Sequence, residues 1–199
     1  MEILTGNSHE LSAGVMTDLS RYRHKVFVEK LGWELKCTDG MELDQFDGPQ
    51  SRYVIGRNSS NAIIASARLL PTTSPYLLSE VFPYVLHGKP APRSPDIWEL
   101  SRFASVDFTA STVPRIARRY EQTVAIELLR ACMAYAATLG ARRLITVSPI
   151  GIERLLQRAD IVMRRAGPPT LINGHPIFAC LIDCQNAQFE DHEHETAAA

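Results

Sequence analysis

The chain has 199 residues, of which 45% are hydrophobic and 22% charged, and its formal net charge is −1. This composition is that of a globular protein and excludes a disordered, collagen-like or low-complexity chain. No run of about 18 apolar residues is present, so we expect no membrane insertion. The N-terminal segment lacks the basic start and apolar stretch of a signal peptide, and the four cysteines form no C-x-x-C motif. We therefore expect a protein of the reducing cytoplasm, without a zinc or redox site.

The first half of the chain alternates helical and strand patterns. Apolar residues recur at helical spacing over residues 11–31, and Gly32 supplies a stop. The polar stretch 33–50 is predicted to be a long loop, and long ordered loops are usually functional. Further along, the patterns predict strands at 52–57 and 62–70, a short helix at 76–86 interrupted by Pro83, and a proline-rich connector at 89–95.

The second half completes an α/β pattern. It predicts a strand at 97–104, a long helix at 116–139, a buried strand at 144–147, a helix from Pro149 to about residue 159, and a strand at 176–183. This order predicts an α/β fold, a three-layer αβα domain with a mixed central sheet. We expect a single domain over residues 1–184 and a disordered acidic tail at 185–199.

Aromatic and charged residues gather around the end of the first predicted helix. Arg23 and Phe27 lie four residues apart on one helix face, Trp33 follows the helix, and Asp44 and Asp47 lie on the next loop. Ring faces and carboxylates both attract a positive centre, so this set suits a cationic ligand. The alternative is structural: the rings belong to the core, and Arg23 and Asp44 form an ion pair.

The strand expected at 97–104 carries charged residues among apolar ones. Alternation places Glu99, Ser101 and Phe103 on one side of the sheet and Leu100 and Arg102 on the other, unless a bulge re-aims one of them. Burying a charged group is costly unless it is paired, which favours a functional role here and for Arg68 in the strand at 62–70. The alternative is an edge strand with one solvated face.

Several motifs of other enzyme classes are absent. The chain has no G-x-G-x-x-G, Walker, H-E-x-x-H or G-x-S-x-G sequence, and no Arg-x-x-Gly-x-Gly/Ala loop that would cradle the pyrophosphate of coenzyme A. Residues 111–165 contain ten arginines and four acidic residues. This excess indicates either an acidic partner or arginines that solvate exposed helix faces.

The candidate residues, taken together, resemble the characteristic set of LuxI-type acyl-homoserine-lactone synthases. The phrases RYRHKVFVEKLGWEL, LDQFD, ARLLPTTSPYLL, WELSRFA and RAGPP extend the resemblance over about residues 11–183. The matching residues, in chain order, are Arg23, Phe27, Trp33, Asp44, Asp47, Arg68, Phe82, Glu99 and Arg102.

This resemblance implies a fold similar to GNAT N-acyltransferases and a reaction between S-adenosylmethionine and an acylated acyl carrier protein. Glu99 would be the general base, and backbone amides at a bulge around Ser101–Phe103 would meet the oxyanion. The ion pairs would shape the S-adenosylmethionine site, with Trp33 and Phe27 beside the adenosine or sulfonium and Phe82 lining the same region. S-Adenosylmethionine is a substrate, so the resemblance implies no cofactor, no metal and no nucleic-acid partner.

The resemblance also implies places for the acyl chain and its carrier. The expected walls of an apolar acyl tunnel are Leu100, Met133, Val147, Ser148, Ile150 and Leu155. Ser148 falls where relatives that take 3-oxo chains often carry Thr, and its alternative role is a helix N-cap before Pro149. Arg154 and Arg158, four residues apart, match basic positions of a docking patch for the acidic carrier protein.

Two other functions compete with this one. The first is a GNAT-like N-acyltransferase that uses acyl-CoA and another amine, against which the missing pyrophosphate loop argues. The second is a catalytically silent domain that binds S-adenosylmethionine or carrier protein, against which the intact Glu99, Arg23 and Arg102 argue.

Overall fold

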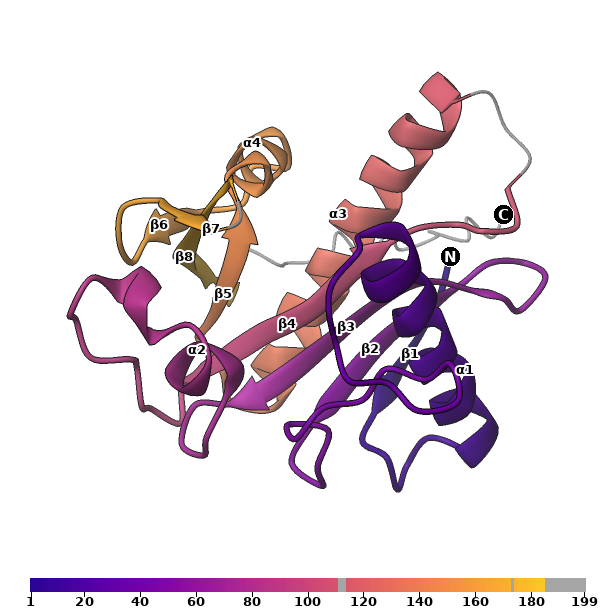
Figure 1. Cartoon of the computed structure of the whole chain (residues 1–199), viewed down its shortest axis with the longest axis horizontal. Coiled ribbons are helices and arrows are strands. Elements are labelled where there is room, and N and C mark those ends of the chain that lie inside the picture. Colours follow the sequence, from indigo (N-terminus) through magenta and orange to yellow (C-terminus); the bar gives the residue numbers. More distant parts are fainter. Residues whose placement is uncertain (111–113, 173, 185–199) are drawn as a thin grey trace, which may run out of the picture.

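A twisted mixed sheet forms the middle layer of the protein, and helices cover both of its faces (Figure 1). The computed structural model describes residues 1–110, 114–172 and 174–184. The strands are β1 (Glu2–Gly6), β2 (Arg52–Arg57), β3 (Ile63–Pro71), β4 (Ile97–Ser105), β5 (Arg143–Pro149), β6 (Met163–Arg165), β7 (Thr170–Ile172) and β8 (His175–Asp183). The helices are α1 (Ala13–Arg23), the π-helix η1 (His24–Lys30), α2 (Leu77–Glu80), the 3-10 helix η2 (Pro83–Leu86), α3 (Pro114–Thr138) and α4 (Gly151–Arg158).

The strands follow the order β1-β2-β3-β4-β5-β8-β6, and β7 pairs with β8. All neighbours are antiparallel except β4 and β5, which run parallel. The parallel pairing is short, because it joins Ile97–Leu100 to Arg143–Thr146 and stops there while β4 continues to Ser105. Among the residues that the structure describes, the edge of β4 that faces β5 therefore has no strand partner beyond Leu100.

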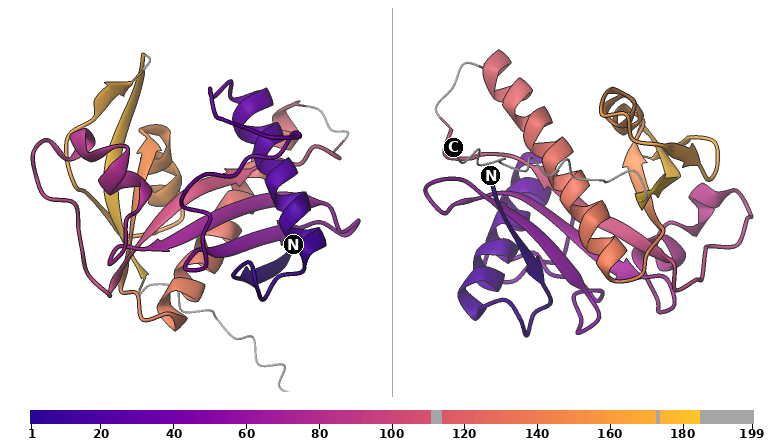
Figure 2. Two further views of the ribbon diagram at one scale, coloured as in Figure 1. Left: turned by 60° about the horizontal axis from the view of Figure 1, so that its bottom comes forward. Right: turned by 180° about the vertical axis from the view of Figure 1, so that it is seen from behind.

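Each face of the sheet has its own apolar core. On one face, α3 and α4 pack on a cluster that includes Leu100, Leu128 and Met133. On the other face, α2 and η2 cover a cluster around Leu78 and Ile145, and α1 with η1 covers Tyr22 and Phe27. α1 lies in front of the sheet in Figure 1, and in the right-hand view of Figure 2, seen from behind, α3 lies in front of it instead. The two helices therefore cover opposite faces, and the αβα expectation is confirmed.

The main helices and strands form where the sequence patterns predict them, with differences at the ends. Ser12 caps α1 by accepting a hydrogen bond from the amide of Val15, and Gly32, with φ of 70°, follows the end of η1. The predicted helix at 11–31 is therefore α1 continued by a π-helix. The strands β1, β6 and β7 were not predicted, because they have at most five residues and form by pairing with β2 or β8.

The prediction for Pro149 was wrong. Pro149 ends β5, where it pairs with Ile177 of β8, and α4 begins two residues later with Ile150 as its N-cap. Ser148 is a strand residue, so it does not cap the helix. Pairing with β8 outweighs the preference of proline for a first helical turn, and the end of a strand is a position where a missing amide proton is tolerated.

Two further statements concern only the part of the chain that the structure describes. None of its helices combines the length and apolarity needed to cross a membrane. No three His, Cys, Asp or Glu side chains within it are grouped as metal ligands would be. The tail expected at 185–199 lies outside the described residues.

Candidate active site

Three arginines and three carboxylates form a closed ring of alternating charges. Arg23 comes from α1, Arg68 from β3 and Arg102 from β4, and the loop between η1 and β2 supplies the carboxylates Glu42, Asp44 and Asp47. In order around the ring, the N···O distances are 2.5 Å for Arg23–Glu42, 2.9 Å for Glu42–Arg102, 2.7 Å for Arg102–Asp44, 2.5 Å for Asp44–Arg68, 3.1 Å for Arg68–Asp47 and 2.8 Å for Asp47–Arg23. The six charges cancel, so the ring holds the loop against the sheet without a net charge of its own.

Burial makes the pairing in this ring strong. Arg23 and Arg68 are almost fully buried, and Asp44 is the most exposed member at 17% of its side chain. Burial by itself would raise the pKa of Asp47, but Arg23 and Arg68 outweigh it and hold that pKa well below its usual range. Burial would likewise lower the pKa of Arg23, and Asp47 and Glu42 instead hold it above its usual value. Asp47 and Arg23 therefore both keep their charges over the physiological pH range.

A β-bulge brings Arg102 to the ring. Ser101 pairs with Arg68 and Ala104 with Ser66, so Arg102 and Phe103 together stand opposite a single residue of β3. Arg102 has a φ of 51°, in the left-handed region. Regular strand alternation predicts Arg102 on the face opposite Glu99 and Ser101. The bulge instead turns Arg102 to the same face as these two residues. Arg102 reaches the ring on the α1 side, and Phe103 packs against the α3 core instead.

Arg102 also connects the ring to a pair of aromatic side chains. The rings of Phe27 and Trp33 are stacked with centroids 4.8 Å apart, and the Arg102 guanidinium lies 5.6 and 5.9 Å from their centroids. Phe27 is buried, whereas Trp33 remains 44% exposed. The guanidinium thus occupies a cation position beside both rings, and the exposed indole remains available for stacking.

Phe82 lies apart from this aromatic pair. It is the residue before η2, packs on the α2 side of the sheet and makes an edge contact with Tyr84 at 6.2 Å between centroids. The structure therefore places Phe82 near the Glu99 side of the site and Phe27 with Trp33 on the α1 side.

Glu99 is buried in a different way from the ring carboxylates. It is 1% exposed, its Oε1 accepts the amide of Leu78 at 2.6 Å, and its Oε2 accepts the amide of Leu77 at 3.0 Å. Burial raises the pKa of Glu99 to about 7, although these two hydrogen bonds and the more distant charge of Arg68 act to lower it. A carboxyl group with this pKa can take up a proton near neutral pH.

Ser101 lies on β4 between Glu99 and the ring. Its Oγ accepts a hydrogen bond from Nε of Arg68 at 3.2 Å, and it lies two residues after Glu99 on the same strand. Glu99 stands opposite Leu70 of β3 and Ile145 of β5, both in the cluster beneath α2. Glu99, Ser101 and Arg102 therefore line one face of β4, from the α2 cluster to the ring.

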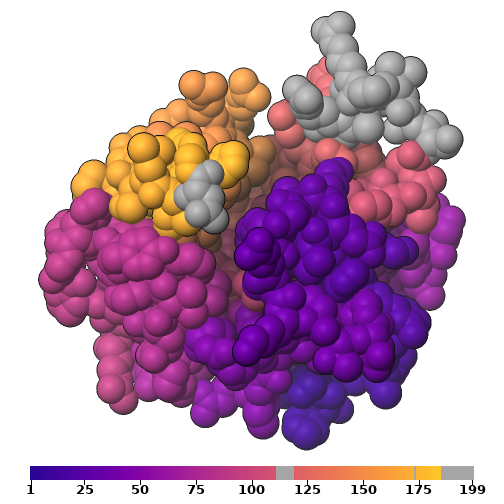
Figure 3. Space-filling view, viewed as in Figure 1, coloured from indigo at the N-terminus to yellow at the C-terminus, as the bar shows by residue number. Residues whose placement is uncertain are grey.

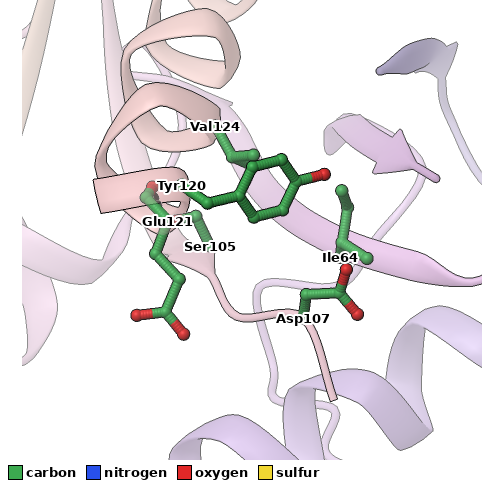
Figure 4. A pocket seen from close by; sticks show the side chains of 6 residues that line it. All are labelled: Ile64, Ser105, Asp107, Tyr120, Glu121 and Val124. Atoms are coloured by element: carbon green, nitrogen blue, oxygen red, sulfur yellow. Dashed lines mark hydrogen bonds between the residues drawn. The ribbon is translucent and has the colours of Figure 1, made fainter. Parts of the chain in front are cut away.

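The face of the protein seen in Figure 3 is hollowed between the N-terminal segments in indigo and the C-terminal segments in orange and yellow. This hollow overlies the middle of the sheet, where β4 and β5 separate beyond Leu100. A separate shallow depression lies between the N-terminal half of α3 and the end of β4 (Figure 4), and it contains none of the predicted site residues. It encloses no space for a small-molecule ligand.

The predicted acyl-tunnel residues divide between two faces of the sheet. Leu100 and Met133 pack together in the α3 core, whereas Val147 packs on the α2 side. Ser148 lies 3.2 Å from Oγ1 of Thr146 on β5. Leu155 is half-buried on α4, and Ile150, at the junction of β5 and α4, is 38% exposed. The described side chains thus do not enclose these six residues in one open tunnel.

The predicted docking residues are on the surface. Arg154 and Arg158 are both exposed on α4, whose opposite face packs Leu156 into the α3 core. Their guanidinium groups therefore point toward solvent, where a charged partner could reach them.

Sequence reasoning missed Glu42, the carboxylate that closes the ring. It is 1% exposed and contacts both Arg23 and Arg102. The sequence did contain a signal, because Glu42 is a third carboxylate in the same loop and stands only two residues before Asp44. The amides of Leu77 and Leu78, in contrast, leave no trace in the side-chain sequence.

The chain is similar to known proteins over most of its length. Residues 7–191 match the family described as autoinducer synthase. An acyl-homoserine-lactone synthase of Acinetobacter nosocomialis is 50% identical over 184 residues, which are 92% of this chain and all of that protein.

Solved structures are similar as well. TofI, in a ternary complex with an inhibitor and MTA, has a TM-score of 0.80 at 40% identity, with 92% of each chain covered. The CoA-dependent acyl-homoserine lactone synthase BjaI, with SAM and isopentyl-CoA, has a TM-score of 0.80 at 25% identity, with 92% of this chain and 83% of that chain covered. A putative N-acetyltransferase from Lactobacillus plantarum, at 15% identity and a TM-score of 0.59, shares the fold alone.

Proposed function

Because the chain belongs to the autoinducer synthase family and is an acyltransferase of the acyl-homoserine-lactone synthase type, we propose that it joins S-adenosylmethionine to the acyl group of an acyl carrier protein, with Glu99 as the general base. The observation that carries the proposal is the buried Glu99 carboxylate, whose pKa of about 7 suits proton uptake near neutral pH. The four cysteines of the described structure are free, which favours action in the reducing cytoplasm.

The first step is amide formation. The α-ammonium of S-adenosylmethionine gives a proton to Glu99, directly or through a water, and the free amine then attacks the thioester carbonyl carbon. The attack leaves the nitrogen positively charged with two protons. One of them passes to the sulfur as the bond between the carbonyl carbon and sulfur breaks, so the nitrogen becomes a neutral amide and the sulfur leaves as the thiol of the carrier protein. Glu99 returns to its carboxylate when the proton is passed on, so the base is regenerated.

Backbone amides near the bulge would stabilise the oxyanion of this step. The bulge interrupts regular pairing with β3 at Arg102 and Phe103, and β5 offers β4 no partner beyond Leu100. An acyl group lying between the separating strands would therefore have its carbonyl oxygen beside this stretch of backbone. Fixed amide dipoles in such a site stabilise developing negative charge without reorganisation.

The second step closes the lactone. The methionine carboxylate attacks the carbon that carries the sulfonium, the carbon–sulfur bond breaks, and methylthioadenosine leaves as a neutral thioether. The six charges of the ring neutralise one another, so the ring contributes to this step by shaping the site and not by its net charge. Its most exposed carboxylate, Asp44, and the exposed indole of Trp33 would contact the cationic substrate.

The proposal is tested by Glu99→Gln, which keeps the shape of the side chain and removes the base. We expect amide formation to fall by roughly 10²–10⁴-fold, the usual effect of losing a general base, while far-ultraviolet circular dichroism and the unfolding midpoint show a folded protein. Thiol release from the acyl carrier protein and mass spectrometry of the lactone measure the two products. Turnover close to that of the unchanged protein would remove Glu99 from this role. No turnover by the unchanged protein with any donor would favour the silent binding domain.

The choice of an acyl carrier protein as donor rests on Arg154 and Arg158, which expose two positive charges on α4. BjaI is described as CoA-dependent, so acyl-CoA is the competing donor. Charged groups at the rim of an interface act mainly on association and are screened over roughly 10 Å at 0.1 M salt. We therefore expect Arg154→Glu with Arg158→Glu to raise the KM for acyl carrier protein and to weaken its salt dependence, with the KM for S-adenosylmethionine unchanged.

A matched control is available on α1 and η1, where Arg21 and Lys25 are also exposed and four residues apart. Arg21→Glu with Lys25→Glu changes the net charge by the same amount and should leave the KM for the carrier protein unchanged. Equal effects of both double variants would indicate a general charge effect, and efficient turnover of acyl-CoA that neither variant alters would assign the donor to coenzyme A.

A further inference from the structure

The two hydrogen bonds that Glu99 accepts come from the first turn of α2. Leu77 and Leu78 are the first two residues of this helix, and the first four amides of any helix have no partner within it. Both amides point to Glu99, one to each carboxylate oxygen. The short helix α2 is thus joined to β4 through the side chain that we assign as the base.

Several contacts hold α2 in this position independently of Glu99. Ser79 Oγ accepts the amide of Tyr76 at 3.2 Å, and the Tyr76 hydroxyl donates to the carbonyl of Pro92 at 2.6 Å. Leu78 is fully buried in the cluster that also contains Leu70. The direction of the two amides is therefore set by packing and by the Tyr76 anchor.

The charged groups around Glu99 do not provide this support. Arg68 of β3 favours the carboxylate and Asp44 of the loop disfavours it, and both act at a distance, without a hydrogen bond to Glu99. The Tyr76 phenol also senses Glu99, because burial and this carboxylate raise the pKa of Tyr76 above its usual value. Burial opposes the charged form of Glu99, and the two backbone amides are its only hydrogen-bond donors among the described residues.

We propose that α2 is the positioning element of the base: the amides of Leu77 and Leu78 aim the Glu99 carboxylate and keep it in its charged, proton-accepting form inside an apolar site. Each oxygen accepts one amide and keeps a second lone pair, which can receive the substrate proton. Leu77 is on this view a positioning residue that acts through its backbone. The inference rests on the proposed function, in which Glu99 is the base.

The chain offers a clean way to remove one of these amides. Leu77 is the first helical residue, where proline is well accepted because the amide has no helical partner. Tyr76 has φ of −140° and ψ of 167°, which is the extended conformation that a residue before proline prefers. Leu77→Pro therefore deletes the donor to Oε2 and keeps α2, while Leu77→Ala removes the side chain and keeps the donor.

The measurement is the pH dependence of thiol release from the acyl carrier protein in the first step. We expect the acidic limb of the Leu77→Pro profile to move to higher pH by about one unit, which is a tenfold loss below the limb, because a charge-assisted hydrogen bond to the carboxylate is gone. At high pH the rate should recover to within about threefold of the unchanged protein, since a more basic carboxylate remains a competent base. The Leu77→Ala limb should stay in place.

A second readout does not depend on turnover. Difference infrared spectra follow the protonated carboxyl band of Glu99, identified by its absence in Glu99→Gln, and the titration of this band should shift upward in Leu77→Pro by the same amount as the kinetic limb. If Leu77→Pro does not fold, an amide-to-ester replacement at Leu77 removes the same donor without a proline ring and should give the same shift.

The outcomes separate this inference from the proposed function. A uniform loss of rate in Leu77→Pro, with the limb and the band unmoved, would overturn the role of α2 and leave Glu99 as the base. A shifted carboxyl band together with a fully active Glu99→Gln variant would instead overturn the role of Glu99 in catalysis, and the coupling between α2 and Glu99 would stand.

Discussion

The carboxylates of the ring and the carboxylate of Glu99 lie on the same side of the sheet but have different kinds of hydrogen-bond donor. In the ring, Glu42, Asp44 and Asp47 each contact two arginines, and their charges are balanced within the ring. Glu99, a few residues along β4 from Arg102, accepts only backbone amides. All of these carboxylates accept hydrogen bonds, but only those of the ring are neutralised by positively charged partners.

The difference shows how the kind of donor beside a buried carboxylate sets its pKa. Full positive charges beside Asp47 hold its pKa below the usual range, whereas burial with neutral dipoles raises the pKa of Glu99 to about 7. Asp47 therefore keeps its charge over the physiological pH range, whereas a carboxyl group with the pKa of Glu99 can exchange a proton near neutral pH. Groups whose surroundings push their pKa values apart are a general sign of divided acid–base roles.

The largest expected effect is the loss of stability when one ion pair of the ring is removed. Asp47→Asn removes one negative charge and leaves Arg23 and Arg68 without a balanced set of partners. Removing one partner of a buried ion pair typically costs about 3–5 kcal/mol, so the free energy of unfolding in urea should fall by that amount. Asp39→Asn in the same loop is the control, because Asp39 is exposed and its loss should change stability by less than about 0.5 kcal/mol. Equal effects of the two changes would mean that the ring is not structural.

The next effect is a fall in the stability contribution of Glu99 as the pH rises. The pKa of Glu99 is raised in the folded protein from an ordinary value near 4.5 to about 7, so its stabilising contribution is present below pH 4.5 and is lost as the pH rises through 7. Between pH 5 and 8 the unchanged protein should therefore lose about 3 kcal/mol relative to Glu99→Gln, since one pKa unit corresponds to 1.36 kcal/mol. Urea unfolding of both proteins across this range gives the difference, and a constant difference would contradict the raised pKa.

Asp47 should show the opposite pH dependence. Its pKa is lowered in the folded protein, so its stabilising contribution is present above pH 4 and is lost as the pH falls below that value. The stability difference between the unchanged protein and Asp47→Asn should hence shrink on acidification and stay constant from pH 5 to 8. The two carboxylates are thus distinguished by the sign of their pH dependence in one set of experiments.

The smallest effect concerns the aromatic pair at the edge of the ring. Trp33 is 44% exposed and stacks on Phe27, so Trp33→Ala should change the free energy of unfolding only slightly. Its loss should weaken binding of S-adenosylmethionine by about 1–2 kcal/mol if the indole contacts the substrate cation. Calorimetric titration with S-adenosylmethionine measures the affinity. Unchanged affinity with a large loss of stability would assign Trp33 to the core.

Much of the fold and of the site could be predicted from the sequence. The periodicity over residues 11–31 and 116–139 is local, because side chains three or four residues apart share a helix face whatever lies opposite. The charged residues Arg23, Asp44, Asp47, Arg68 and Arg102 stood out as well, because charges within apolar segments need partners wherever they are buried. The edge strand β1 and the short strands β6 and β7 escaped prediction, since their pairing partners supply most of their stability.

The sequence by itself determined which groups are present and roughly where they lie along the chain. Only the tertiary structure decided which face Arg102 occupies, because the bulge depends on the register between β3 and β4. It also decided that Glu42 closes the ring and that Glu99 faces backbone amides and no arginine. Backbone donors are the same in every residue, so no sequence pattern distinguishes the amides of Leu77 and Leu78 from any others. Whether a buried carboxylate is paired with arginines, as Glu42 is, or with backbone amides, as Glu99 is, was set by which donors the folded chain brought to it.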